Sequence, residues 1–204
     1  MHKHLEPSRE FLLRDEYIGA FIKKYGPVKH RRTHPRRPFE ALARSIIYQQ
    51  LSGKAADTIC GRFVALFKPH SFPTPEDVLQ AKITTLRGAG LSQQKISYLK
   101  DLAQKCTDGT IDSRRFSKMS DEEIIEHVTA VKGIGEWTAH MFLMFTLGRP
   151  DILPVGDLGI RKGFQKLFGL KSLPSPRTMT RLAKPWAGHR TVACFYLWRL
   201  LEEK

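Results

Sequence analysis

The chain has 204 residues, of which 41% are hydrophobic, and this is enough to bury the core of one compact domain or of two small lobes. Its formal net charge of +14 and its pI near 9.9 suit a polyanionic partner, either nucleic acid or an anionic membrane surface. No apolar run reaches the roughly 20 residues that span a bilayer, and the amino-terminal residues lack the apolar core of a secretion signal. We therefore expect an intracellular protein that is not inserted in a membrane.

The cysteines and histidines do not form the pattern of a metal site. Cys60, Cys106 and Cys194 are far apart in the sequence, and the eight histidines are scattered without an H-E-x-x-H pair. We expect the three thiols to be reduced and structural. The sequence thereby disfavours a metal-dependent hydrolase.

The first part of the chain combines a predicted helix with a basic run. Residues 10–24 carry apolar side chains at mixed helical spacing, which predicts an amphipathic helix that Gly26 and Pro27 would end. From Lys23 to Arg37 there are seven Lys or Arg residues and no acidic residue. This basic run is either a solvated loop or a surface that contacts the backbone of nucleic acid, and the sequence leaves both readings open.

Two glutamines stand at the junction of the next two predicted helices. Pro38 opens the first helix, and its buried stripe consists of Phe39, Leu42, Ile46 and Ile47. Ser52 is placed to cap the second helix. Gln49 and Gln50 are then either the polar face of a helix or part of a kink that pushes Gln50 outward.

Three further helix starts carry capping residues. Thr74 is followed by Pro75 and acidic residues, which predicts a short helix to about Ala81. Ser120 and Glu123 have the spacing of a capping box. Between these two helices the chain breaks at residues 88–90 and resumes with Ser92 as a cap and Lys95 in the first turn, which predicts a contact to phosphate.

The stretch from Val131 to Gly159 combines a glycine turn, an apolar helix and an acidic residue. Gly133 and Gly135 allow backbone N–H groups to approach an anion, and a helix N-terminus favours negative charge. After a helix predicted over residues 137–147, Asp157 stands just ahead of a second helix. The turn is either an anion grip or an ordinary helix connection, and Asp157 is either a functional carboxylate or a plain N-cap.

The carboxyl-terminal part completes an all-helical pattern. A helix follows Asp157, a Pro/Ser-rich link at residues 172–178 precedes a helix with Trp186, and residues 191–204 predict a last helix that is apolar on nearly every side. We expect this last helix to be buried against the first. No segment alternates with a period of two, so the predicted fold class is all-α with about ten helices.

Five segments, taken together, resemble the helix–hairpin–helix DNA glycosylases, specifically the 3-methyladenine (alkylbase) branch. They are PFEALARSIIYQQLSGKAA, LRGAGLSQQKISYL, VKGIGEWTA, DILPVGDLGIRKG and RTVACFYLWR, and they follow the family's order from about Pro38 to Arg199. The resemblance implies a single bilobal α-helical unit with an active-site cleft between the lobes. One lobe would comprise about residues 38–148, and the other about residues 1–37 with 149–204.

The resemblance also implies roles for individual residues. Asp157 is similar to the family's catalytic aspartate. The base pocket would be lined by Trp137, Met141, Trp186 and His189. The wedge into the duplex and its minor groove would consist of Gln50, Leu51 and Ser52. The DNA backbone would be bound by Gly53, Lys54, Gly90, Ser92, Lys95, Gly133, Ile134, Gly135 and Thr138. A monovalent cation, Na⁺ or K⁺, would bind through backbone carbonyls near Val131 and Gly133, and no other cofactor is implied.

Two positions bear on the outcome of the reaction. Trp137 occupies the position at which bifunctional relatives carry a Schiff-base lysine, so the resemblance implies a monofunctional enzyme without lyase activity. Near Trp186, relatives read W-x-P-[YW]-R-[ST], whereas this chain has Gly188 and His189 in place of proline and the aromatic residue. This departure predicts a wider or more polar base pocket.

The expected function is therefore hydrolysis of the N-glycosidic bond of alkylated purines, such as 3-methyladenine and 7-methylguanine, in duplex DNA. The product would be an abasic site. Two alternatives stay open, a non-catalytic module that binds damaged DNA and a glycosylase for deaminated or mismatched bases. The resemblance implies a monomer whose partner is double-stranded DNA, with no membrane partner. The location would be the cytoplasm, at the nucleoid, in a bacterium and the nucleus in a eukaryote.

Overall fold

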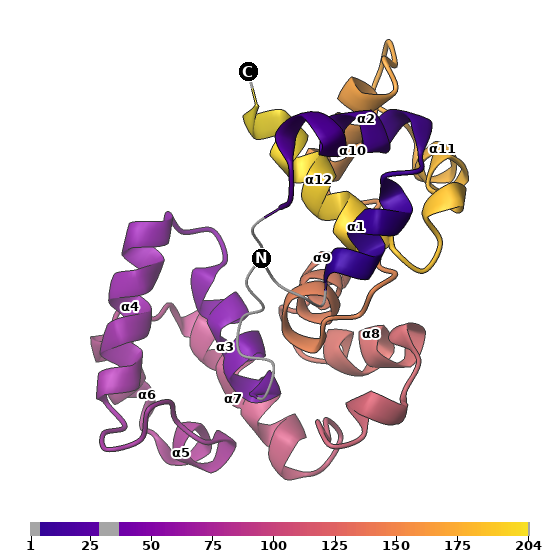
Figure 1. Cartoon of the computed structure of the whole chain (residues 1–204). Helices are drawn as coiled ribbons and strands as arrows, with labels where there is room; N and C mark the ends of the chain where they lie inside the picture. The colour runs from indigo at the N-terminus through magenta and orange to yellow at the C-terminus, as the bar shows by residue number, and fades with distance from the viewer. Residues whose placement is uncertain (1–4, 29–36, 204) are drawn as a thin grey trace. The chain divides into compact units, whose positions relative to one another are not determined.

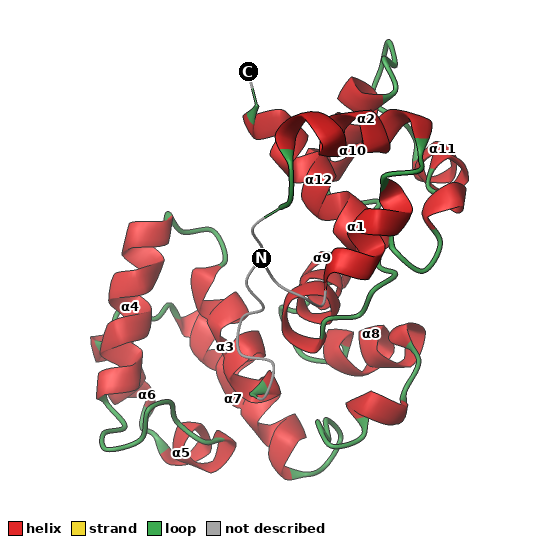
Figure 2. Ribbon diagram, viewed as in Figure 1, coloured by secondary structure: helices red, strands yellow, loops and turns green. Residues whose placement is uncertain are grey.

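The computed structural model describes residues 5–28 and 37–203, and within these ranges it contains helices, turns and loops but no strand (Figure 2). The predicted all-α class is confirmed. No helix in this part of the chain is long and apolar enough to cross a membrane. Most of the basic run, including Lys29, Arg31, Arg32 and Arg36, lies outside the described residues.

The chain divides into two compact units (Figure 1). The split unit comprises Met1–Arg32 and Leu143–Lys204, and the continuous unit comprises Thr33–Phe142. The described helices of the split unit are α1 (Glu6–Leu12), α2 (Glu16–Tyr25), α10 (Leu158–Leu167), α11 (Pro176–Leu182) and α12 (Arg190–Glu202). Those of the continuous unit are α3 (Pro38–Tyr48), α4 (Gly53–Ala65), α5 (Pro75–Gln80), α6 (Ile83–Gly88), α7 (Gln93–Thr107), α8 (Asp121–Thr129) and α9 (Glu136–Met141).

The predicted first helix is two helices, because Asp15 interrupts it. The Asp15 Oδ1 atom accepts hydrogen bonds from the backbone N–H groups of Tyr17 at 3.0 Å and Ile18 at 2.9 Å, so this residue is the N-cap of α2. Its Oδ2 atom accepts a bond from the indole Nε1 of Trp186 at 3.0 Å. Asp15 therefore starts α2 and ties its first turn to a distant part of the sequence.

Other boundaries confirm or correct the sequence-based expectations. Thr74 and Ser120 form capping boxes, and Ser92 caps α7 by accepting from the Lys95 N–H at 3.2 Å. The helix predicted over residues 137–147 is α9 followed by a π-helical segment, Phe142–Leu147. Trp186 lies in a short 3₁₀ segment, Lys184–Trp186, rather than on α11.

The core of the split unit is built around α12, whose residues from Thr191 to Leu197 are all buried. This helix contacts α1 and α2, which confirms the expected packing of the last helix against the amino-terminal segment, but its main partner is α10. The two helices meet closely at Gly163, where an added Cβ atom would lie 2.8 Å from the Cβ atom of Leu197. A side chain at position 163 would therefore force α10 and α12 apart.

Basic side chains close the C-terminal ends of several helices. The Lys95 ammonium donates to carbonyl oxygens at the end of α3, and Lys100 donates to Leu79 and Ala81 at the end of α5. In the split unit, Lys166 and Arg199 similarly bind carbonyl oxygens at the ends of α12 and α2. These bonds satisfy exposed carbonyls and complement the negative end of each helix dipole.

Replacing Gly163 with alanine tests the contact between α10 and α12. We expect Gly163→Ala to lower the free energy of unfolding by about 1–3 kcal/mol, because the added methyl group overpacks the crossing. The matched control is Gly61→Ala inside α4, where a Cβ atom would meet nothing within 4 Å. This control should be stabilised by about 0.5–1 kcal/mol, since alanine favours the helix. Equal stability of the two variants in urea unfolding would contradict the close crossing.

Candidate functional site

Asp157 is the N-cap of α10, and its carboxylate is held in place by two donors. Its Oδ1 atom accepts a hydrogen bond from the Ile160 N–H at 2.7 Å and one from the indole Nε1 of Trp198 at 3.0 Å. The first bond is the ordinary capping interaction. The second is not required by a cap, because it comes from α12. Together they fix the orientation of the carboxylate plane.

The loop before Asp157 is braced by the start of α12. The Thr191 hydroxyl donates to the Arg149 carbonyl at 2.7 Å and accepts from the Ile152 N–H at 3.0 Å, and the Thr191 N–H donates to the Pro150 carbonyl at 3.0 Å. Arg190 adds an ion pair with Asp151 at 3.3 Å. The segment that leads to the carboxylate is thereby bound to the same helix that carries Trp198.

Trp198 reaches Asp157 because α10 has no side chain at position 159. A Cβ atom there would lie 2.9 Å from the indole ring of Trp198. The indole also stacks with two phenylalanine rings, Phe145 and Phe195, at 5.9 Å and 6.2 Å between ring centroids. Sequence reasoning missed this tryptophan, since on a helix that is apolar on nearly every side it is indistinguishable from a core residue.

In the continuous unit, the glycine turn between α8 and α9 is a tight hairpin. Gly133 has a φ of 81°, in the left-handed region, and the Ile134 N–H donates to the Val131 carbonyl at 3.1 Å. Gly133 rests on the ring of Tyr98 so closely that an added Cβ atom would be 2.1 Å from a ring carbon. Glycine is required at this position by both its backbone conformation and its neighbour.

A carboxylate on α7 anchors the start of the hairpin. Asp101 accepts a hydrogen bond from the Lys132 N–H at 2.9 Å and binds the Lys105 ammonium with both oxygens at 2.9 Å. Burial alone would raise the pKa of Asp101, but the Lys132 N–H and the charge of Lys105 outweigh it and hold the pKa below its usual value. The group is therefore ionised at neutral pH and holds the hairpin to α7.

The glutamines at the end of α3 form a turn rather than the polar face of a helix. α3 ends at Tyr48, and Gln50 adopts a left-handed conformation with a φ of 56° and is exposed. The expected outward kink is confirmed. Ser52 stands at the N-cap position of α4, but its side chain makes no capping bond.

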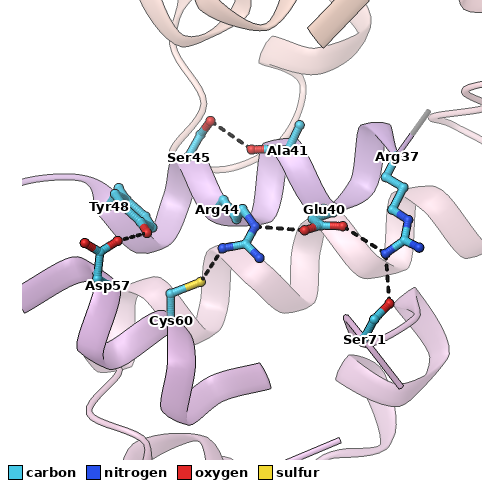
Figure 3. A network of polar contacts seen from close by, with 9 residues as sticks. All are labelled: Arg37, Glu40, Ala41, Arg44, Ser45, Tyr48, Asp57, Cys60 and Ser71. Carbon is cyan, nitrogen blue, oxygen red and sulfur yellow. Dashed lines mark hydrogen bonds and ion pairs between the residues drawn. The ribbon is translucent and has the colours of Figure 1, made fainter. Parts of the chain in front are cut away.

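Polar contacts between α3 and α4 support this turn (Figure 3). The Tyr48 hydroxyl donates to Asp57, and this bond raises the pKa of Tyr48 to about 12. One turn earlier on α3, the Arg44 guanidinium bonds both to the buried Glu40 at 2.9 Å and to the Cys60 thiol at 3.1 Å. The two helices that flank the turn are therefore joined by two polar contacts, Tyr48 to Asp57 and Arg44 to Cys60.

Two predicted site residues are corrected by the structure. Trp186 is fully buried between Phe164 and Phe168 and bonds to Asp15, so it is a core residue and does not line a pocket. Lys95 donates to the Ile47 carbonyl at 2.6 Å and the Gln49 carbonyl at 2.8 Å, so it supports α3 rather than standing ready for phosphate. Its burial also lowers the pKa of the ammonium.

The other predicted residues differ in exposure. His189 packs on α1, where its Nδ1 atom lies 2.9 Å from the Ser8 hydroxyl and its ring lies 4.2 Å from that of Phe11. Trp137 is 53% exposed, whereas Met141 is partly buried. Leu51, Gly53, Lys54, Gly90, Ser92, Gly133 and Gly135 are exposed, but Ile134 and Thr138 are buried.

The site offers no cluster of metal-binding side chains. Within the described residues no group of three or more His, Cys, Asp or Glu side chains is placed to hold a metal ion. The three cysteines are free thiols, as expected. What the described residues present are a fixed carboxylate in the split unit, and in the continuous unit a glycine hairpin and an exposed glutamine turn.

Residues 43–188 match the family model described as HhH-GPD superfamily base excision DNA repair protein, and the chain belongs to this family. The resemblance predicted from the five segments is confirmed.

Several proteins similar to this chain carry the name 3-methyladenine glycosylase or glycosidase. DNA-3-methyladenine glycosylase 1 of Schizosaccharomyces pombe is 36% identical over 91% of this chain and 82% of its own length. A solved structure of the S. pombe enzyme with abasic DNA has a TM-score of 0.83 at 33% identity, covering 97% of both chains. The DNA-3-methyladenine glycosidase of Bacillus halodurans has a TM-score of 0.85 at 35% identity, covering 97% of this chain and 92% of that one.

The left-handed conformation of Gln50 predicts an unusual response to substitution. We expect Gln50→Gly to leave the free energy of unfolding unchanged or to raise it by up to about 1 kcal/mol, because glycine relieves the strain of a positive φ. Gln104→Gly, within α7, is the control and should cost about 1 kcal/mol. Equal losses in thermal unfolding would mean that Gln50 is not held in this conformation.

Proposed function

We propose that this chain is a monofunctional DNA glycosylase that releases alkylated purines, such as 3-methyladenine and 7-methylguanine, from duplex DNA and leaves an abasic site. The observation that carries the proposal is the carboxylate of Asp157, fixed by Ile160 and Trp198 in a chain of the base excision repair superfamily. A protein that only bound DNA would gain nothing from a rigid carboxylate directed at a polyanion.

Hydrolysis of the N-glycosidic bond requires one negative charge and one water molecule. An N-alkylated purine is already cationic, so the C1′–N9 bond breaks with both electrons passing to the base, which leaves as a neutral molecule. The sugar develops the positive charge of an oxocarbenium ion, and the Asp157 carboxylate stabilises this charge. Water adds its oxygen to C1′ and passes a proton to the same carboxylate. The strand stays intact because Trp137, rather than a lysine, occupies the Schiff-base position.

The continuous unit would hold the DNA while the base is out of the stack. A glycosidic bond inside a duplex is out of reach, so the nucleotide must be flipped into the enzyme. We propose that Gln50 fills the gap that the flipped nucleotide leaves, with Leu51 and Ser52 beside it in the minor groove. The N–H groups of the hairpin would bind phosphates, and the exposed ring of Trp137 suits a cationic base through a cation–π contact.

No cofactor takes part in the proposed reaction, but the hairpin fits a monovalent cation. The Val131 carbonyl accepts one bond from the Ile134 N–H, and the Gly133 carbonyl accepts one from the Gln49 side chain. Each carbonyl oxygen has two lone pairs, so both would be able to hold Na⁺ or K⁺, which would add positive charge near the bound backbone. A monomer acting on duplex DNA, at the nucleoid or in the nucleus, completes the proposal.

Asp157→Asn tests the proposed catalyst with little change of structure. The amide oxygen still accepts from Ile160 and Trp198, so the fold should be retained while the negative charge is lost. We expect release of 3-methyladenine from an alkylated duplex to fall by about 100-fold or more, because the oxocarbenium ion loses its counter-charge. Binding to a duplex with an abasic analogue serves as the control. Undiminished release would rule out Asp157 as the catalyst.

The same release assay on duplexes with single lesions separates the alternatives. Release from alkylated purines alone supports the proposed substrate class, whereas preferential release of deaminated or mismatched bases would assign the scaffold to those lesions. Binding of a damaged duplex without release of any base would mean that the chain is a non-catalytic module that recognises damage. This panel is informative because Gly188 and His189 depart from the family pattern near the predicted base pocket. In this structure the His189 ring packs on Phe11 of α1.

Trp198→Phe tests whether the indole positions the carboxylate. Phenylalanine retains the stacking on Phe145 but cannot donate to Asp157, so we expect base release to fall about tenfold, the value of one hydrogen bond to a charged group. Trp186→Phe is the matched control because it removes an equivalent bond to Asp15 in the core. It should lower the melting temperature with little effect on release at saturating DNA. Similar release by both variants would contradict a special role for Trp198.

A further inference from the structure

Gln49 is the point at which the glutamine turn meets the hairpin. Its side-chain Nε2 atom donates to the Gly133 carbonyl at 2.8 Å, a contact between residues 84 positions apart in the sequence. Its own carbonyl accepts from the Lys95 ammonium at 2.8 Å. Gln49 is therefore bound through its backbone to α7 and through its side chain to the hairpin.

The hairpin side of this contact is held by α7. Tyr98 lies against Gly133, and Asp101 binds the Lys132 N–H. Lys95, Tyr98 and Asp101 are spaced three residues apart, so they lie along one face of the helix. The same face thus supports the turn through Lys95 and the hairpin through Tyr98 and Asp101.

The turn side is held by α3, α4 and α7 together. The Leu51 N–H donates to the Tyr48 carbonyl at 3.3 Å, and the Tyr48 hydroxyl donates to Asp57 on α4 (Figure 3). Between these supports Gln50 keeps its left-handed conformation, which costs about 1 kcal/mol or more and persists only where the surroundings impose it. The Gln49 side chain is the direct link between this strained turn and the hairpin.

We propose that Gln49 is a positioning residue that sets the distance and register between the glutamine turn and the phosphate-binding hairpin. This inference rests on the proposed function, in which Gln50 fills the gap in the duplex while the hairpin binds the backbone. If the turn moved independently of the hairpin, Gln50 would less often enter the gap in a duplex whose backbone the hairpin already binds. Gln49 would then contribute to the recognition of damage without contacting the lesion.

The test compares two duplexes, one intact and one with a tetrahydrofuran abasic analogue. Gln49→Met preserves side-chain length but removes the donor to Gly133. We expect its preference for the abasic duplex over the intact one to fall by about three- to tenfold, the value of one neutral hydrogen bond. The salt dependence of binding to intact duplex should be unchanged, since no phosphate contact is lost. Gln80→Met, at the exposed end of α5, is the matched control and should keep the preference.

A double variant shows whether Gln49 acts through Gln50. If it does, Gln49→Met combined with Gln50→Ala loses no more preference than Gln50→Ala alone. If the double variant instead loses preference by the product of the two single losses, Gln49 has a separate DNA contact and the inference is overturned. It is also overturned by an equal loss of affinity for both duplexes, or by an unchanged preference in a Gln49→Met variant that melts at the wild-type temperature. These binding measurements need no base release, so their outcome is independent of the Asp157→Asn result.

Discussion

The arrangement of the split unit depends on the close crossing of α10 and α12. Gly159 and Gly163 lie one helical turn apart on α10, and at both positions a Cβ atom would collide with α12, at Trp198 and at Leu197. Because the backbones approach this closely, the indole of Trp198 reaches the carboxylate that caps α10. The start of α12 also binds the loop that leads to Asp157 through Thr191. A single helix therefore packs the core, braces the loop and orients the proposed catalyst.

In the continuous unit α7 has a comparable role. One of its faces supports the end of α3 through Lys95 and the hairpin through Tyr98 and Asp101. The proposed function, in which the hairpin binds the DNA backbone and the turn fills a gap in the duplex, needs these two elements at a fixed separation, since loose parts would lose binding free energy to ordering. Anchoring both to one rigid helix, with Gln49 as a direct link, meets this requirement.

The positive charge of the chain has two uses in this structure. The net charge of +14 suits DNA, but Lys95, Lys100, Lys166 and Arg199 bind carbonyl oxygens at the ends of helices. The last carbonyls of a helix have no partner within it, so these cations stabilise the fold by binding them and by complementing the helix dipole. A charge count from the sequence therefore includes cations that have structural partners, such as Lys95.

The sequence by itself determined the helical class, the starts of the helices at Thr74, Ser92 and Ser120, and the family. These features are local or follow a fixed order along the chain, and capping residues, periodic apolar positions and glycine turns can be read without knowing which segments meet. Only the tertiary structure decided that Trp186 is core, that Trp198 binds Asp157, and that Gln49 binds the hairpin. The physical reason is that a hydrogen bond between distant residues depends on how closely the helices pack. That closeness is set by the absence of side chains at a few glycines, which leaves no periodic signal in the sequence.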